Sequence, residues 1–174
     1  MKAWKRHGHR GRVILIALAG ASLAACATQP LTVPGSVGGT MRPYQVNGVW
    51  YRPAFQPHYD EKGLASWYGP QARYRTTATG ERFDERIASA AHRTLPLPCV
   101  VEVTNLDNGR KVRLRVNDRG PFVKGRILDV SRKGAQELGF WGQGVARVRV
   151  RYVGPANTTP DHANRYAEAE SAER

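Results

Sequence analysis

Three short segments of the chain carry the side chains best suited to acid–base chemistry. In the segment NDRGPF, residues 117–122, Asp118 stands where an alternating apolar strand gives way to a Gly-Pro turn, which presents its carboxyl group at the mouth of a loop. Glu81 follows Thr79 and a glycine, and His92 follows two alanines. A positioned carboxylic acid with a raised pKa can protonate a leaving oxygen. The pattern therefore indicates Asp118 as a candidate proton donor.

The same residues also suit structural roles. Asp118 before Arg, Gly and Pro fits a turn-forming residue whose side chain bonds its own backbone. Glu81 fits a solvated loop acid, and His92 fits a hydrogen-bonded histidine of the interior. The residues alone leave both interpretations open.

The elements that must position these side chains are mostly β-strands. Residues 63–69 read as a short strand bounded by glycines, and residues 100–106 and 111–116 flank Asp107-Asn108-Gly109, a strong hairpin signal. Within the second arm, apolar and basic residues alternate, which predicts one core face and one solvent face. The basic set on that expected solvent face is Lys111, Arg113 and Arg115.

The last strand and one helix complete the expected fold. Residues 147–152 alternate arginines with Val148, Val150 and Tyr152. One helix is indicated, with Ser131 as its N-cap and Gly139 as its stop. Short strands with one small helix before the closing strand favour a small closed barrel in a mainly β fold. We expect this domain to span residues 59–153.

The amino terminus predicts export and lipidation. Five basic residues precede the apolar run 13–25, which is too short for a membrane-spanning helix and is typical of a signal peptide at residues 1–25. The run ends in LAAC, residues 23–26, which resembles a bacterial lipobox. We therefore expect Cys26 to be acylated, with palmitate among its chains, and to hold the protein on a membrane.

The regions on either side of the barrel are expected to be simpler. Residues 26–58 are rich in Pro, Gly and Thr, which suits a lipid-anchored linker. Within that linker, Asn47-Gly48 lies between two aromatic, β-prone arms and predicts a hairpin that packs on the domain. Residues 154–174 are polar and rich in Ala and Glu, so we expect a disordered tail.

Charge and cysteine content limit the class of protein. The chain has 27 Lys and Arg against 14 Asp and Glu; without the five basic residues of the signal, 22 remain against 14, a balance of +8. An exported chain meets phospholipid headgroups and peptidoglycan as polyanions, and paired aromatic and basic platforms are scarce, so nucleic acid is not an expected partner. Of the two cysteines, Cys99 lies in an apolar run and suits a buried position. No metal and no cofactor are predicted.

Six segments together resemble the rare lipoprotein A (RlpA) family, lytic transglycosylases of the bacterial envelope. The resemblance covers about residues 63–153 and rests on GLASWYG, TGERFD, AAHRTLP, VTNLDNG, NDRGPF and RILDVS, which begin at residues 63, 79, 90, 103, 117 and 126. It implies a six-stranded double-psi β-barrel. One departure is Thr79, which stands where Asn or Ser is expected. Another is that the chain ends before the sporulation-related repeat that many relatives carry.

The resemblance also implies the roles of the site residues. Asp118 would be the catalytic acid, with Glu81 as a second catalytic candidate and His92 lining or supporting the cleft. The remaining cleft or supporting positions are Asn117, Arg119, Tyr68, Trp67 and Thr79. Because neighbouring strand residues point to opposite faces, we expect one of Trp67 and Tyr68 to face the core and the other to face solvent or a sugar.

The implied reaction needs a single acid. Hydrolysis of a glycosidic bond uses two carboxyl groups, whereas a lytic transglycosylase lets the muramic acid's own carbon-6 hydroxyl attack its anomeric carbon, giving a 1,6-anhydro end. Asp118 would serve as acid and then as base on the MurNAc-GlcNAc bond. The alternative is an expansin-like, non-catalytic wall binder, because the same barrel occurs in that class and fold alone does not decide function.

A further hypothesis concerns substrate choice. Some of the arginines near the site would pair with the lactyl carboxylate of muramic acid, which is free only in peptide-stripped glycan. The candidates are Arg73, Arg75, Arg113, Arg115, Arg119 and Arg147. The simpler interpretation of these arginines is a solvated strand face.

The expected location is the cell envelope, on the periplasmic side of the outer membrane. There the chain would take part in cell-wall remodelling and daughter-cell separation. Its partners would be peptidoglycan strands, the membrane through Cys26, and possible divisome proteins, and the protein is expected to be a monomer.

Overall fold

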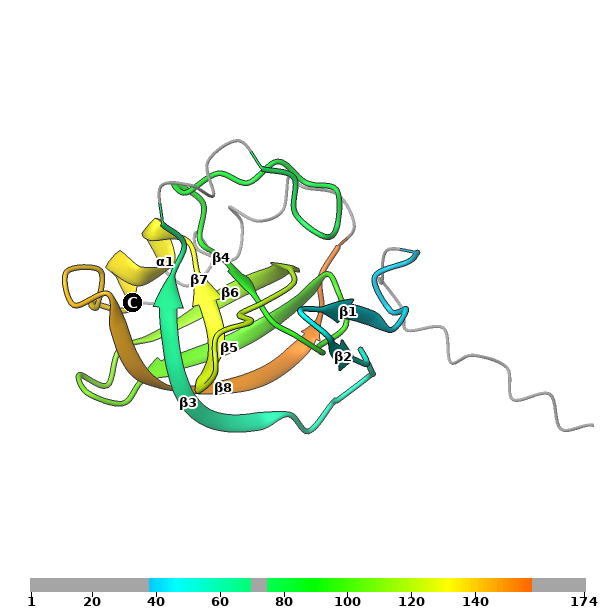
Figure 1. Ribbon diagram of the computed structural model, residues 1–174. Coiled ribbons are helices and arrows are strands. Elements are labelled where there is room, and N and C mark those ends of the chain that lie inside the picture. Colours follow the sequence, from blue (N-terminus) through cyan, green and yellow to red (C-terminus); the bar gives the residue numbers. More distant parts are fainter. Residues whose placement is uncertain (1–37, 70–74, 158–174) are drawn as a thin grey trace, which may run out of the picture. The chain divides into compact units, whose positions relative to one another are not determined.

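The computed structural model describes residues 38–69 and 75–157, and its centre is a closed barrel of six strands (Figure 1). In the order found around the barrel, these are β3 (Asp60–Trp67), β7 (Arg126–Val130), β4 (Ser89–Ala91), β6 (Lys111–Asp118), β5 (Cys99–Asn105) and β8 (Val145–Pro155). The pairs β3–β7 and β4–β6 are parallel, and the other neighbours are antiparallel. The expected mainly β fold with six barrel strands is confirmed.

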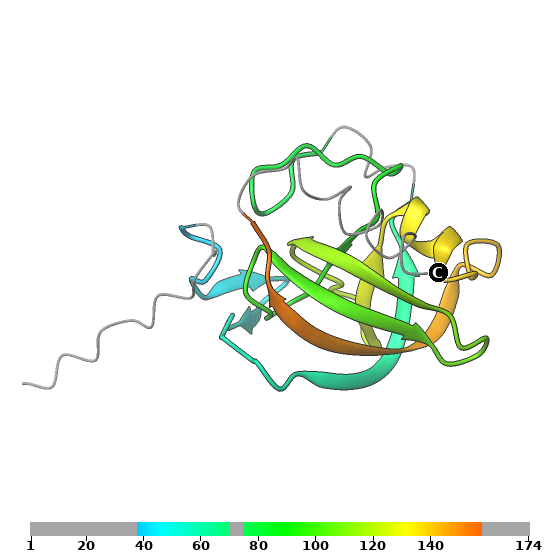
Figure 2. The same cartoon turned by 180° about the vertical axis from the view of Figure 1, so that it is seen from behind.

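Inward-facing aliphatic side chains fill the barrel. Alternate residues of the long strands are fully buried, which leaves a packed interior. The largest contributors from the strands are Val101, Val103, Leu114, Val116, Leu128, Val130, Val148 and Val150. The long β8 lies beside both β3 and β5, as Figure 2 shows from behind, and so joins the two ends of the strand order.

The predicted turn and helix signals form the expected elements. Asp107, Asn108 and Gly109 lie in the turn between β5 and β6. Helix α1 (Arg132–Glu137) starts after Ser131, whose Oγ accepts a hydrogen bond from the Gly134 N–H at 3.1 Å. It ends before Gly139, which has a φ of 75°.

A separate hairpin precedes the barrel. Strands β1 (Tyr44–Val46) and β2 (Val49–Tyr51) pair antiparallel around Asn47 and Gly48, whose φ values of 48° and 80° suit a type I′ turn. Because an isolated two-stranded hairpin is marginally stable, its contacts with the barrel residues must hold it in place.

The structure corrects one prediction about strand faces. Arg115 was expected on the solvent face of β6, but its side chain is 1% exposed. The loop that carries Glu81 covers this end of β6, so a guanidinium that alternation places outside the barrel still becomes buried. Arg113, two residues earlier, is exposed as expected.

Several expectations fall outside the described residues or concern single groups. The signal, Cys26, Arg73 and most of the tail lie outside the ranges that the structure describes. Within those ranges no helix is both long and apolar enough to cross a bilayer. Cys99 is fully buried, and burial raises the pKa of its thiol to about 12, in agreement with the expected apolar position.

Candidate active site

Asp118 is the last residue of β6 and lies opposite Ala91 of β4. The register shifts between Ala90, which pairs with Val116, and Ala91, which pairs with Asp118, so Asn117 is an extra residue in the ladder. Such bulges re-aim side chains and are common beside active sites. The His92 main-chain N–H donates to the Asp118 carbonyl oxygen at 3.1 Å, so the residue after β4 is bonded to the last residue of β6.

Neutral donors surround the carboxyl group of Asp118. Its Oδ1 accepts the N–H groups of Ala78 at 2.9 Å and Arg119 at 2.8 Å, and its Oδ2 accepts the Tyr68 hydroxyl at 3.3 Å. Among the described residues, no basic side chain forms an ion pair with it. Burial raises the pKa of Asp118 above its ordinary value, against the opposing effect of these hydrogen bonds.

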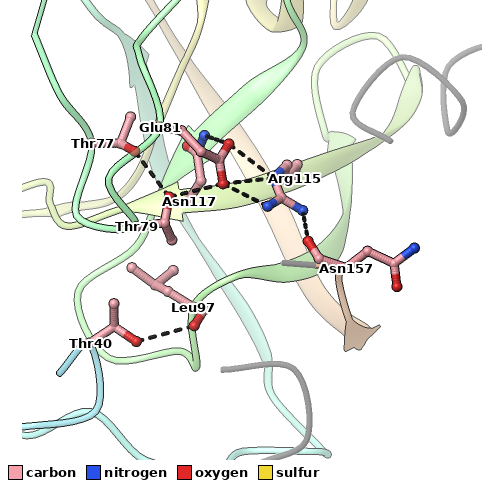
Figure 3. A network of polar contacts seen from close by, with 8 residues as sticks. All are labelled: Thr40, Thr77, Thr79, Glu81, Leu97, Arg115, Asn117 and Asn157. Carbon is pink, nitrogen blue, oxygen red and sulfur yellow. Dashed lines mark hydrogen bonds and ion pairs between the residues drawn. The ribbon is translucent and has the colours of Figure 1, made fainter. Parts of the chain in front are cut away.

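Glu81 is held very differently, by the network of polar contacts that Figure 3 shows around its carboxylate. Its carboxylate accepts hydrogen bonds from Arg115 Nη2 at 2.6 Å, Asn117 Nδ2 at 2.8 Å and Thr79 Oγ1 at 2.9 Å. Burial alone would raise the pKa of Glu81, but the bonds from Arg115, Asn117 and Thr79 outweigh it and leave the pKa below its ordinary value. Glu81 is therefore ionised at neutral pH.

The Glu81–Arg115 pair is a buried ion pair. The side chains are 12% and 1% exposed, and Arg115 Nη1 also donates to the Asn157 carbonyl at 2.8 Å, beyond the end of β8. Thr79 connects the pair to the rest of the site, since its N–H donates to the Asn117 carbonyl at 3.2 Å. The network thus fixes the loop whose Ala78 N–H binds Asp118.

The His92 ring is 2% exposed and belongs to the interior. Its Nδ1 accepts the N–H groups of Thr94 and Leu95, so Nε2 carries the proton and donates to the Tyr59 hydroxyl at 2.8 Å. Burial lowers the pKa of His92 to about 3, with Arg93 and Arg119 adding to the effect. His92 is therefore neutral, and its contact with Asp118 runs through the main chain.

Arg119 ties three segments together. Its Nη1 donates to the carbonyls of His92 at 3.1 Å and Leu95 at 2.6 Å, while Nη2 donates to the Thr40 carbonyl at 2.6 Å. Its guanidinium also lies 5.9 Å from the centre of the Tyr44 ring. The Arg119 side chain therefore supports the loop after Asp118. The hydrogen bond from Arg119 to the Asp118 carboxyl group comes from its main-chain N–H.

The two aromatic residues at the end of β3 take different surroundings. Tyr68 packs against Phe83 with ring centres 4.8 Å apart and ring planes tilted by 59°, and it directs its hydroxyl to Asp118. Trp67 packs against the core and lies 6.3 Å from Trp141. Both are half-buried, so the expected division into one core ring and one solvent ring is not seen.

Two contributors were missed at the level of the sequence. Arg115 was assigned to solvent because of strand alternation, and the Ala78 N–H carries no side-chain signal. The sequence around Glu81 gave no hint of either contact, because Glu81 lies in a polar segment after Thr79 and Gly80. In the described part of the chain, no group of three or more His, Cys, Asp or Glu side chains is placed to hold a metal ion.

Comparisons with known proteins agree on the family. The family model described as "Lytic transglycolase" matches residues 60–150. The endolytic peptidoglycan transglycosylase RlpA of Rickettsia prowazekii is 50% identical over 113 residues, covering 63% of this chain and 35% of that protein. The protein of the same name from Neisseria meningitidis serogroup A is 46% identical over 125 residues, covering 71% and 52%. The chain thus spans about a third to a half of the length of these relatives.

Among solved structures, the Streptomyces papain inhibitor is similar in part. It shares 21% identity and a TM-score of 0.48, covering 57% of this chain and 99% of that chain. Together, the six-stranded closed barrel and the family match identify the fold as a double-psi β-barrel.

Proposed function

This chain belongs to the RlpA family of lytic transglycosylases, and on that basis we propose that its barrel cleaves peptidoglycan glycan strands without hydrolysis. The bond cut is that between MurNAc and GlcNAc, and the product is a 1,6-anhydro-MurNAc end. The observation that carries the proposal is a contrast between two acids: the half-buried Asp118 forms no ion pair with any basic side chain that the structure describes, whereas Glu81 is held ionised by Arg115.

Asp118 performs both proton transfers in this mechanism. In its protonated form it gives a proton to the glycosidic oxygen as the bond to the MurNAc anomeric carbon breaks. The resulting carboxylate accepts the proton of the MurNAc carbon-6 hydroxyl as that oxygen bonds to the anomeric carbon. Asp118 ends in its starting state, and no water is consumed. Its raised pKa supports the first step because a greater fraction of the carboxyl group is protonated.

Glu81 acts in this proposal as a scaffold residue. Its carboxylate is engaged by Arg115, Asn117 and Thr79, and its lowered pKa disfavours proton donation. Because Arg115 neutralises its charge, Glu81 contributes by holding the 77–81 loop, which supplies the Ala78 N–H to Asp118.

Arg75 is the candidate that best fits recognition of the lactyl carboxylate. Arg115 and Arg147 are paired with Glu81 and Asp107, and Arg119 is occupied by main-chain carbonyls. Arg75 and Arg113 are both exposed, but it is the charge of Arg75 that acts on Asp118: burial raises the pKa of that carboxyl group, and Arg75 is among the groups that oppose the rise. Arg73 lies outside the described residues. We therefore assign the preference for peptide-stripped glycan to Arg75.

The substrate assignment is tested with paired glycans. Arg75→Gln should reduce cleavage of stripped glycan much more than the slower cleavage of peptide-bearing glycan, because only the stripped strand offers a free lactyl carboxylate. Arg113→Gln, an exposed change on the β6 face, is the matched control. Equal losses on both glycans, or equal effects of the two variants, would remove Arg75 from recognition.

The reaction itself is tested by its products. Stripped sacculi are digested with the full-length chain in detergent, and the released glycans are analysed by mass spectrometry. Anhydro-MurNAc ends are expected, and Asp118→Asn should abolish them while Asp107→Asn, at an exposed ion pair, should not. Reducing ends would indicate a hydrolase. Binding without any cleavage would favour the expansin-like alternative.

The proposed location follows from Cys26. An acylated Cys26 would hold the barrel on the periplasmic face of the outer membrane, where its substrate lies, during wall remodelling and daughter-cell separation. Cys26→Ser should release the protein from the membrane fraction, and the wild-type chain should carry the mass of its acyl groups. Unchanged membrane association of Cys26→Ser would contradict the anchor.

A further inference from the structure

Three aromatic rings from two parts of the chain meet beside the site. Tyr44 and Tyr51 face each other across the β1–β2 hairpin with ring centres 5.3 Å apart, and Phe122 lies 6.2 Å from Tyr44 and 5.3 Å from Tyr51. We refer to these three rings as the aromatic cluster. The two tyrosines precede residue 60, where the match to the family model begins.

The aromatic cluster is connected to Asp118 through the residues that directly follow Asp118 in the chain. Phe122 follows Asp118 by four residues, through a turn in which Gly120 has a φ of 135°. Arg119 donates its main-chain N–H to Asp118 while its guanidinium lies over Tyr44. Burial raises the pKa of Tyr44, Arg119 opposes the rise, and the negative charge of Asp118 adds to it.

Part of the aromatic cluster's surface stays exposed, although the hairpin is anchored to the barrel. Polar contacts contribute to this anchoring: the Tyr44 hydroxyl donates to the Arg93 carbonyl at 2.9 Å, and Thr40 Oγ1 donates to the Leu97 carbonyl at 3.1 Å. Phe122 remains 39% exposed in spite of its two ring contacts. Val49, which shares the hairpin face of Tyr51, is 53% exposed. An open apolar face thus remains next to the proposed acid.

We infer that the aromatic cluster is a sugar-stacking subsite that extends the glycan-binding surface beyond Asp118. Its occupant is an aminosugar ring of the same strand that the barrel cleaves, so the inference rests on the proposed function. The face of a pyranose ring carries C–H groups that pack on an aromatic face, and the Tyr51 hydroxyl offers a partner to its polar edge. The subsite would hold the strand on one side of the scissile bond.

The hairpin provides its own matched control. Trp50 pairs with Gln45 across the hairpin, so its side chain lies on the face opposite to Tyr51, and it is 59% exposed. A general effect of removing an exposed aromatic residue from the hairpin should appear in Trp50→Ala. An effect of the subsite should not.

The test measures binding separately from cleavage. In the full-length Asp118→Asn chain, the Kd for stripped glycan oligosaccharides is measured after Tyr51→Ala or Phe122→Ala. Each should weaken binding by about five- to tenfold, equivalent to the loss of one stacking contact. Trp50→Ala should leave the Kd unchanged. The variants Tyr51→Phe and Phe122→Tyr retain a ring and should restore binding, which separates stacking from a folding defect.

The outcomes that overturn the inference are distinct. An unchanged Kd in folded Tyr51→Ala and Phe122→Ala would contradict it, and so would an equal loss in Trp50→Ala. Loss confined to peptide-bearing strands would assign the face to the stem peptide instead. Release of anhydro ends by the wild-type chain, together with normal binding by the variants, would reject the subsite alone. Weakened binding by the variants with no cleavage by the wild type would reject the proposed reaction and keep the subsite.

Discussion

Among the described residues, Glu81 is bonded by a buried guanidinium and Asp118 by neutral donors, and this difference sets the direction of each pKa shift. Both carboxyl groups are partly buried, and both accept several hydrogen bonds. Asp118 receives them from two main-chain N–H groups and a phenol, whereas Glu81 receives them from a buried guanidinium, an amide and a hydroxyl. The pKa values consequently move in opposite directions, upwards for Asp118 and downwards for Glu81. Burial raises the pKa of a carboxyl group unless a nearby cation stabilises the charged form.

The comparison also shows how the two sites depend on each other. The Glu81 network fixes the 77–81 loop and Asn117, and that loop gives Asp118 one of its donors. In the proposed mechanism, Glu81 is therefore part of the scaffold and Asp118 is the acid that meets the substrate. Pairs of titratable groups with diverging pKa values are typical of sites in which one residue transfers protons.

The largest effect is expected from Asp118→Asn. Loss of the general acid should reduce cleavage by about 10²–10⁴-fold. The fold should be retained, because a carboxyl group with a raised pKa contributes stability below its unfolded pKa and loses it as pH rises through the folded pKa. The free energy of unfolding at neutral pH, measured by urea denaturation, should thus not fall. A strongly destabilised variant would place Asp118 in the scaffold together with Glu81.

The next effect is expected from breaking the buried pair. Glu81→Ala leaves the Arg115 guanidinium buried without its partner and should lower the free energy of unfolding by about 3 kcal/mol. Replacing both partners, as in Glu81→Leu with Arg115→Met, should cost less because no charge is left buried. The matched exposed pair is Arg147–Asp107, where Asp107→Ala should change stability very little. Equal losses from Glu81→Ala and Asp107→Ala would contradict the comparison.

A smaller effect concerns His92 and pH. Its folded pKa of about 3 lies below the ordinary value of 6.5, so between these values the unfolded chain binds a proton that the folded chain does not. Stability from His92 is present above pH 6.5 and declines as pH falls towards 3. His92→Gln should lower stability at neutral pH and flatten the dependence on pH. Comparing urea unfolding at about pH 7 and about pH 4.5 tests this, and an unchanged slope would refute it.

The smallest effect is expected from Tyr68→Phe. The Tyr68 hydroxyl favours the charged form of Asp118, so removing this donor should raise the pKa of that carboxyl group further. Activity should then persist to slightly higher pH, because the protonated acid persists. The pH profile of cleavage is the measurement. A shift to lower pH would show that the hydroxyl acts on something other than the carboxylate.

Much of the fold was predictable because its signals are local. The Asp107-Asn108-Gly109 turn, the Ser131 cap and the alternation along β8 each depend on a few neighbouring residues, and all three appear as expected. The position of Asp118 at a strand end was likewise predictable from the Gly-Pro turn that follows it. The double-psi crossing was implied by the family resemblance, since alternation carries no information on strand order.

The site's electrostatics were not predictable for a physical reason. Whether Arg115 faces water depends on a loop more than 30 residues earlier in the chain, and the ladder bulge at Asn117 changes where neighbouring side chains point. The docking of the hairpin beside Phe122 likewise joins segments far apart in the sequence. These contacts are set by tertiary structure, which strand periodicity does not encode.

The most direct test of the account is a titration of the side-chain carboxyl carbons of the full-length chain by NMR, with Asp118→Asn and Glu81→Gln used to assign the two signals. The account predicts that Asp118 titrates above the ordinary aspartate value of 3.8 and that Glu81 titrates below the ordinary glutamate value of 4.5. The reverse order, with Glu81 holding its proton to higher pH than Asp118, would contradict the assignment of Asp118 as the proton donor.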